Sequence, residues 1–168
     1  MVEIKALFEY NWYCRGKFLD AMTKLPWEKL VENREASFYS MRNVFLHSLE
    51  AEQNWVRRLS TGKMGEWSKH NYDQDFKDVE AMRQYMNEVE SESRTILMKL
   101  EPEDLEKVFP WPAKDGTINS FRIEDILLHV VEEEIHHRGE ILCLMWQIDA
   151  TPPYTSYTAY LAETKKEK

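Results

Sequence analysis

Residues 126–146, with the sequence ILLHVVEEEIHHRGEILCLMW, decide the fold of this chain. They predict one long helix that is apolar at both ends and ionisable in the middle. The apolar flanks cover almost every direction around the helix axis, so the helix should be buried on most sides. Buried charge is costly unless it is paired or binds a metal ion. The ionisable belt consists of His129, Glu132, Glu133, Glu134, His136, His137, Arg138 and Glu140.

Three further long helices are predicted from apolar residues at mostly helical spacing. They cover residues 2–25, residues 37–59 and residues 76–100. Ser37 is the expected N-cap of the second of these helices. A connector over residues 26–36 joins the first two helices, and a polar loop with Gly62 and Gly65 follows the second.

The segment between residues 101 and 120 is not expected to form a long helix, because four helix-breaking residues interrupt it. They are Pro102, Pro110, Pro112 and Gly116. Residues 109–111 and 117–121 flank the Lys114-Asp115-Gly116 turn signal and predict a short hairpin or an extended loop. Ser120 is then expected to cap the fourth helix, with Glu124 and Asp125 in its first turn, where the helix dipole favours acids.

The predicted fold is all-α, a four-helix bundle with a long connection before the last helix, formed by residues 1–168 as a single domain. The tail from Ile148 contains Pro152-Pro153 and several tyrosines, and we expect it to pack back as a loop and a short turn. Few glycines and prolines occur, five and six, and they gather at the predicted boundaries.

Composition narrows the function classes. The formal net charge is −8, and no cluster of basic residues occurs outside the Lys165-Lys166 tail, so nucleic-acid binding is disfavoured. No apolar run resembles a signal peptide or reaches the length of a membrane span, and we expect a cytoplasmic protein. Cys14 and Cys143 form no CxxC motif and are expected to be buried thiols.

The belt offers one clear pair of metal ligands. Glu133 and His137 stand at i and i+4 on one helix face, with Cβ atoms roughly 5–6 Å apart. A third ligand should come from a facing helix, and His47, between Leu46 and Leu49 in the second helix, is the natural candidate. His47, Glu133 and His137 would supply two imidazoles and one carboxylate and leave positions open for water or substrate.

Other interpretations of the belt stay open. His129 with Glu133 is a second i, i+4 pair, and a run of Glu and His can also be a solvated face held by ion pairs. His136 and Glu140 could orient a ligand imidazole by hydrogen bonding. Arg138 is expected to pair with Glu134 or with a neighbouring helix. No catalytic residue can be assigned from the sequence.

Several residues outside the predicted ligand set also carry expectations. Glu50 and Glu52, near His47, are either supporting groups or merely exposed. Gly139 costs roughly 1 kcal/mol of helix stability against alanine, and its expected use is the close approach of another helix or a ligand. Core packing is the expected role of the tryptophans at helical spacing, which are Trp12, Trp55 and Trp146.

With these residues in its predicted second and fourth helices, the chain resembles the DinB/YfiT-like metalloenzyme family. The stretch His137-Arg138-Gly139-Glu140-Ile141 is similar to that family's HRGQ-type motif, and the preceding Leu127-Leu128-His129-Val130-Val131 looks like its fourth helix. His47, in Phe45-Leu46-His47, fits the family's first ligand. The tail with Pro152-Pro153 and tyrosines is similar as well. The family's usual pattern is HxxxH, and this chain has Glu133 at the first of those positions.

The resemblance implies a divalent metal ion, zinc or nickel first, with iron or manganese also compatible with this donor set. It further implies a transferase type of enzyme that uses a low-molecular-weight thiol, or a hydrolytic relative, in which the metal activates a thiol or water. The alternative is a non-catalytic, metal-stabilised module for stress or dimerisation. A homodimer is compatible with the apolar surface, and the partner of the enzyme would be a small-molecule substrate.

Overall fold

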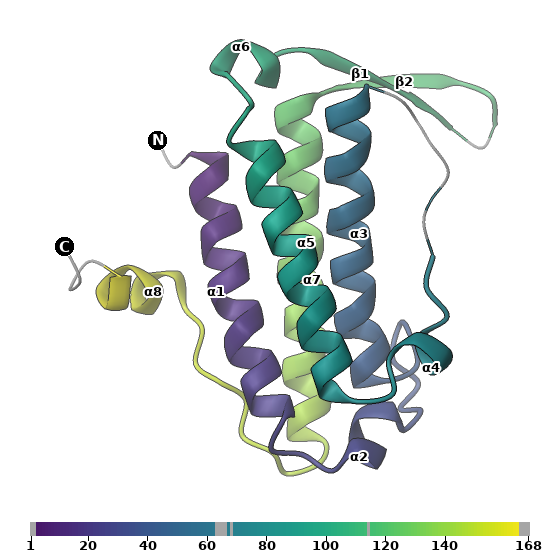
Figure 1. The fold of residues 1–168 in the computed structure, drawn as a ribbon, viewed down its shortest axis with the longest axis vertical. Helices are drawn as coiled ribbons and strands as arrows, with labels where there is room; N and C mark the ends of the chain where they lie inside the picture. The colour runs from purple at the N-terminus through teal and green to yellow at the C-terminus, as the bar shows by residue number, and fades with distance from the viewer. Residues whose placement is uncertain (1–2, 63–66, 68, 114, 165–168) are drawn as a thin grey trace.

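The computed structural model describes residues 3–62, 67, 69–113 and 115–164, and it is mostly helical. Four long helices lie side by side (Figure 1). They are α1 (Ile4–Met22), α3 (Met41–Thr61), α5 (Val79–Leu97) and α7 (Ile123–Trp146). The short helices are α2 (Trp27–Val31), α4 (Tyr72–Asp75), α6 (Pro102–Leu105) and α8 (Tyr157–Thr164). The predicted all-α class is confirmed, and the described residues also form one small two-stranded hairpin.

The long helices are arranged so that each contacts two others. α3 packs against α7 and α5, and α1 packs against the same two helices. The long connection between α5 and α7 carries α6 and the hairpin, which lie at one end of the helices (Figure 1). Among the described residues, no helix is both long enough and apolar enough to cross a membrane.

The start of α3 differs from the prediction. Ser40, not Ser37, is the N-cap, and its hydroxyl accepts a hydrogen bond from the backbone N–H of Asn43. The two serines lie three residues apart and offer the same local capping signal, so the sequence alone did not separate them. α3 ends at Gly62, whose φ of 66° is the left-handed conformation that suits glycine at a helix C-terminus.

The predicted hairpin is present as strands β1 (Val108–Pro112) and β2 (Ile118–Arg122), paired antiparallel with Phe109 opposite Phe121. Ser120 pairs with Pro110 inside this ladder, so the expectation that it caps α7 is wrong. Arg122 precedes the helix instead. Glu124 and Asp125 do occupy the first turn of α7, as predicted from the helix dipole.

Other boundaries shift by a few residues. α5 begins at Val79, three residues after the predicted start at residue 76, and Asp78 is its N-cap. The tail forms the eight-residue helix α8, where only a turn was expected. Expectations for Val2, Gly65, Lys114 and the Lys165-Lys166 tail fall outside the described residues.

The apolar interior consists of two clusters. One includes Phe18, Met22, Phe45, Met82 and Ile141. The other includes Phe8, Trp12, Trp55, Ile126 and Val130. Along α7, the residues that lie in sequence between these clusters include the buried Glu134, His137 and Arg138. The ionisable belt therefore enters the interior between two apolar layers, where its charges need partners.

Candidate metal centre

The three predicted ligands come together between α3 and α7. His47 lies on α3, and Glu133 and His137 lie one turn apart on α7. One potential ligand atom from each residue lies within 4.8 Å of the other two. His137 Nε2 is 3.5 Å from Glu133 Oε2. This geometry brings two imidazoles and one carboxylate to one place, which is a donor set that divalent transition metals accept.

His47 is held with its ring in a fixed position. Its imidazole stacks on Phe38, with ring centroids 3.6 Å apart and an interplanar angle of 17°. Burial, reinforced by the nearby His137, lowers the pKa of His47 to about 4. The imidazole is therefore neutral at physiological pH, and the neutral form is the one that ligates a metal.

His137 is oriented by Glu140, as the sequence suggested. His137 Nδ1 lies 3.1 Å from Glu140 Oε2. Burial opposes ionisation of Glu140, but hydrogen bonds from Ser37 outweigh it and hold the pKa of this carboxyl below its usual value. An ionised carboxylate only accepts hydrogen bonds, so His137 Nδ1–H is the donor. The Nε2 atom of His137 is then the one left for a ligand.

Ser37 fixes Glu140 in turn. Its backbone N–H donates to Glu140 Oε1 over 2.7 Å, and its hydroxyl donates to Glu140 Oε2 over 2.7 Å. Ser37 thus serves the site and not a helix end. The connector between α2 and α3 is in this way attached to α7, directly beside His137.

The alternative ligand pair is also geometrically possible, at a more exposed place. His129, Glu132 and Glu133 bring ligand atoms within 4.8 Å of one another, but His129 and Glu132 are exposed. His136 is exposed too, with its ring centroid 5.1 Å from that of His137. The predicted belt therefore divides into a solvated side and a buried side.

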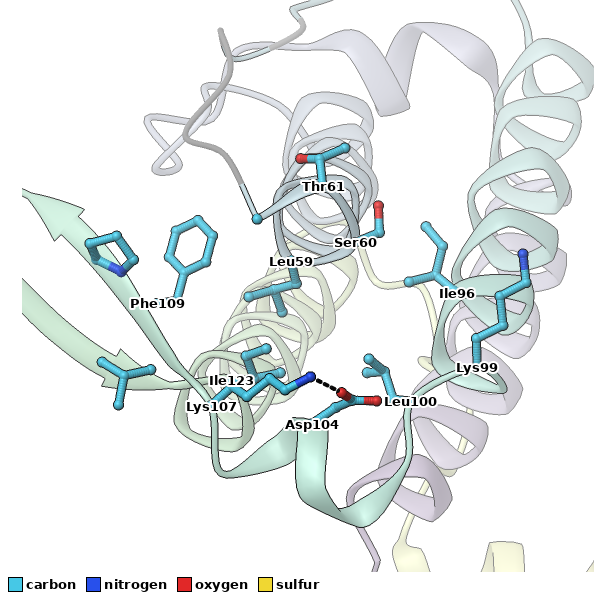
Figure 2. Close-up of a pocket in the computed structure, with 13 residues that line it drawn as sticks. Leu59, Ser60, Thr61, Ile96, Lys99, Leu100, Asp104, Lys107, Phe109 and Ile123 are labelled. Atoms are coloured by element: carbon cyan, nitrogen blue, oxygen red, sulfur yellow. Dashed lines mark hydrogen bonds and ion pairs between the residues drawn. The ribbon is translucent and has the colours of Figure 1, made fainter.

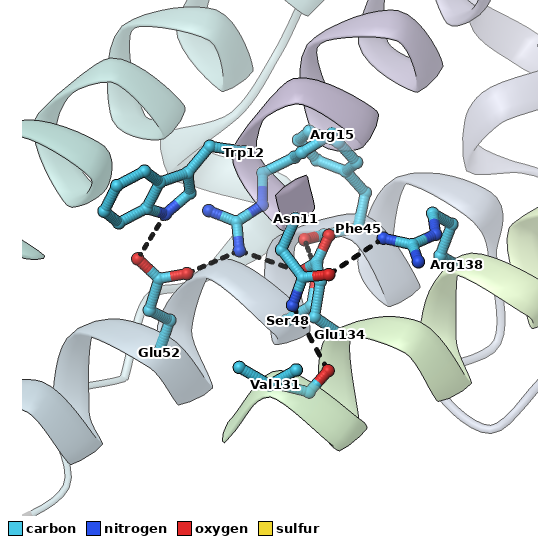
Figure 3. A network of polar contacts seen from close by, with 9 residues as sticks. All are labelled: Asn11, Trp12, Arg15, Phe45, Ser48, Glu52, Val131, Glu134 and Arg138. Atoms are coloured by element: carbon cyan, nitrogen blue, oxygen red, sulfur yellow. Dashed lines mark hydrogen bonds and ion pairs between the residues drawn. The ribbon is translucent and has the colours of Figure 1, made fainter. Parts of the chain in front are cut away.

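The buried side contains an ion network that the sequence interpretation missed (Figure 3). Arg15 on α1 is 2% exposed, and its Nη2 atom lies 2.6 Å from Glu52 Oε2 and 2.8 Å from Glu134 Oε2. Trp12 Nε1–H donates to the other oxygen of Glu52. Arg15 follows Trp12 by three residues and precedes Leu19 by four, so helical spacing places it on the apolar face of its helix. This spacing could have indicated a buried arginine from the sequence alone.

Arg138 lies beside this ion network and contacts a neighbouring helix, which was one of the two roles predicted for it. Its Nη1 donates to Asn11 Oδ1 on α1 over 3.1 Å. Asn11 Nδ2 donates to the carbonyl of Val131, which links the helices a second time (Figure 3). Glu134 pairs with Arg15, and the hydrogen bonds of Arg138 go to Asn11 and Tyr10 on α1.

A cavity of about 560 Å³ adjoins the triad at His47. It is lined by Phe38, His47, Glu50, Trp67, Lys69, His70 and Tyr72. A small molecule in this cavity would contact His47 directly. Glu50, left open by the sequence as a supporting or exposed group, is 5% exposed and lies in the cavity wall.

A second cavity, of about 640 Å³, lies away from the triad, where the C-terminal ends of α3 and α5 meet α6 and β1 (Figure 2). Its wall includes Leu59, Ile96 and Phe109, and Lys107 pairs with Asp104 beside it. None of the residues that line it belongs to the predicted ligand set.

Two expectations about α7 are wrong, and so is one of the two alternatives given for Gly139. Trp146 is 56% exposed and so is not a core residue. Cys143 is exposed, whereas Cys14 is buried as expected. No other helix approaches Gly139 closely, since a Cβ atom added there would meet no other atom within 4 Å among the described residues, and the approach of a ligand stays a prediction. All three residues lie on the exposed side of α7. Apolar residues occur around more of the circumference of α7 than the neighbouring helices cover, so some of them remain exposed.

Comparison with known proteins gives consistent matches. A model of the DinB family matches residues 1–168. Protein DinB of Bacillus subtilis (strain 168) is 26% identical over 169 aligned residues, which cover 96% of this chain and 95% of that protein. Protein YizA of the same organism is 21% identical over 150 residues, covering 89% of this chain and 91% of YizA.

A solved structure shares the fold. The crystal structure of a DinB-like protein from Bacillus subtilis superposes with a TM-score of 0.65 at 13% sequence identity. The match covers 90% of this chain and 98% of the other.

Proposed function

Since the chain belongs to the DinB family, we propose that it binds a divalent metal ion between α3 and α7 through His47, Glu133 and His137. The observation that carries this proposal is the convergence of the three ligand atoms within 4.8 Å. The orientation of His137 by Glu140 supports it, because metal-ligating histidines commonly donate their other ring N–H to a carboxylate.

The donor set also bears on the identity of the metal. Three neutral histidines would leave a divalent ion at a formal charge of about +2, whereas the Glu133 carboxylate lowers this to about +1. Two imidazoles and a carboxylate suit zinc or nickel and also suit iron or manganese. We propose zinc or nickel as the resident metal.

We further propose that the protein is a metal-dependent enzyme of the thiol-dependent transferase type. A bound divalent ion would lower the pKa of a coordinated thiol or water molecule toward 7, so that the ionised form is available at neutral pH. The protein's own residues hold the imidazoles in place, and the cavity beside His47 offers space for a small-molecule substrate. A catalytic site needs this open position, whereas a structural metal site is closed by a fourth protein ligand.

The test is elemental analysis of protein purified without an affinity tag, combined with a screen of low-molecular-weight thiols as cosubstrates. We expect stoichiometric metal in the wild type, its loss in His47→Ala, and its retention in His70→Ala. His70 is a suitable control because it lines the same cavity but is not one of the three grouped ligands.

The outcomes separate the proposals. Equal metal content in the His47→Ala and wild-type proteins would contradict the ligand assignment. Metal without any activity in the thiol or hydrolysis screens, together with a site closed by a fourth protein ligand in a metal-bound crystal structure, would favour the non-catalytic module.

A further inference from the structure

Glu50 is a buried carboxylate beside the predicted metal site. It follows His47 by three residues on α3, so both side chains lie on one helix face, and both line the same cavity. Its Oε1 accepts a hydrogen bond of 2.7 Å from the backbone N–H of His70, and its Oε2 accepts one of 3.1 Å from the hydroxyl of Tyr72. Both donors are neutral groups.

The charge of Glu50 has no cationic partner within 4.0 Å among the residues that the structure describes. This contrasts with Glu52 and Glu134, which share the guanidinium of Arg15. Burial, and after it the charge of Glu50, raises the pKa of both Tyr72 and Tyr85. A buried charge without a counter-ion is costly. Its position in a cavity wall indicates a ligand that supplies the missing charge.

The other walls of the cavity are largely aromatic. Phe38, Trp67 and Tyr72 line it, and each is half-buried with part of its surface exposed. The faces of aromatic rings attract cations, most strongly where water is excluded. An anionic carboxylate next to several aromatic side chains is the combination that recognises organic ammonium groups.

We propose that this cavity binds an organic cation, an amine or a quaternary ammonium compound, with Glu50 as its counter-ion and the aromatic side chains around its alkyl groups. The inference deepens the proposed function and rests on it in one respect: the bound cation is taken to be the substrate presented to the triad at His47.

Other charged side chains also lie near the cavity, and one of them is Arg58, whose Cζ atom lies 4.7 Å from the centroid of the Trp67 ring in its aromatic wall. Glu133 is a ligand of the proposed metal ion, so its charge is neutralised there and does not add to the preference of the cavity for a cation. Among the described residues that line the cavity, Lys69 is the one positive side chain, and it is exposed. Solvent screens an exposed charge more strongly than a buried one, so Glu50 should dominate. A cavity governed by Lys69 would instead prefer an anion.

Three probes of similar shape and different charge distinguish these cases. They are choline, its neutral carbon isostere 3,3-dimethylbutan-1-ol, and the anion 3,3-dimethylbutanoate. We expect calorimetric titration to show binding of choline at least about tenfold tighter than that of the neutral isostere, and no binding of the anion. Equal affinity for choline and its isostere, or preference for the anion, would overturn the proposal.

Variants then locate the binding. Glu50→Gln keeps an acceptor for the neighbouring donors but removes the charge, and it should abolish the preference for choline over its isostere. Glu80→Gln, an exposed change on α5, should leave it unaltered. Lys69→Ala alters an exposed residue and should tighten choline binding several-fold if charge governs the cavity. Unchanged or weaker choline binding in Lys69→Ala would count against the proposal even if Glu50→Gln failed to fold.

Metal content, measured in the same samples, separates this inference from the function on which it rests. Choline selectivity in a protein without metal would retain the cation site and reject the metal site. A metal-loaded protein without choline selectivity would reject only the cation site.

Discussion

Glu133 occupies the position of the first histidine in the HxxxH pattern of the DinB family, and this one residue sets the charge of the predicted site. Because carboxylates and imidazoles both ligate divalent ions, Glu133→His should retain metal and shift the preference toward zinc. Competition between zinc, nickel and manganese, followed by elemental analysis, measures the shift. His129→Ala is the matched control and should change nothing, because His129 belongs to the exposed group. Complete loss of metal in Glu133→His would contradict the assignment of Glu133 as a ligand that histidine can replace. Loss of metal in His129→Ala would move the site to the alternative pair, His129 with Glu133.

Glu140 acts through His137, so its replacement tests orientation and not ligation. Glu140→Ala removes the acceptor for both Ser37 and His137 and should weaken metal affinity about 10–100-fold. Glu140→Gln retains an acceptor and should lose less. Metal titration against a competing chelator gives the affinities. If the alanine and glutamine variants both matched the wild type, the proposed role of Glu140 would be wrong.

At the scale of the elements, Arg15 joins three helices, because it lies on α1 and pairs with Glu52 on α3 and Glu134 on α7. Arg15→Met would remove the guanidinium that the two buried carboxylates share, and the free energy of unfolding should fall by about 3–5 kcal/mol. Urea denaturation followed by circular dichroism measures this loss. The triple variant that adds Glu52→Gln and Glu134→Gln should regain part of the stability, and its failure to do so would show that packing, not charge, explains the effect.

The two serines before α3 allow a crossed test of helix capping. Ser40→Ala removes the cap of α3 and should cost about 1 kcal/mol of stability with no change in metal affinity. Ser37→Ala removes one hydrogen bond to Glu140 and should weaken metal affinity while leaving the helix intact. Denaturation and metal titration of both variants check the pair of expectations, and identical behaviour of the two variants would contradict them.

These same elements show what the sequence could predict. Helical spacing located all four long helices, since periodicity depends on neighbours within a few residues. The capping residues Ser37 and Ser120 were misassigned, because each has a local capping signal and only tertiary contacts decide its use. Glu133 and His137 followed from one-turn spacing, whereas the pairing of Arg15 with Glu134 joins residues far apart in the chain.

The tertiary contacts of Glu50 and Glu52 could not be predicted from the sequence for a related reason. Glu50 and Glu52 are two residues apart on one helix, and the sequence left both as supporting or exposed groups. In the structure they point to different surroundings, one to the cavity and one to the ion network. That difference depends on which helix covers each face, and no short-range pattern encodes it.

For the whole molecule, metal should stabilise the fold because its three ligands come from two different helices. A ligand that binds only the folded state at about 100 times its Kd adds about 2.7 kcal/mol, so chelation should lower Tm measurably. Differential scanning calorimetry with and without EDTA tests this expectation. The His47→Ala protein is the control and should be insensitive to EDTA. A wild-type melting curve unaltered by EDTA would contradict metal-linked stability.

The contact of Ser37 with Glu140 makes one peptide N–H a reporter on the site from a distance. This N–H lies in the connector before α3 and donates to the carboxylate that holds His137. Its deuterium exchange rate therefore depends on how firmly that carboxylate is kept in place. Loading the protein with an ion should slow exchange at Ser37, and mass spectrometry of a peptide from the connector could follow occupancy without labelling any residue of the site.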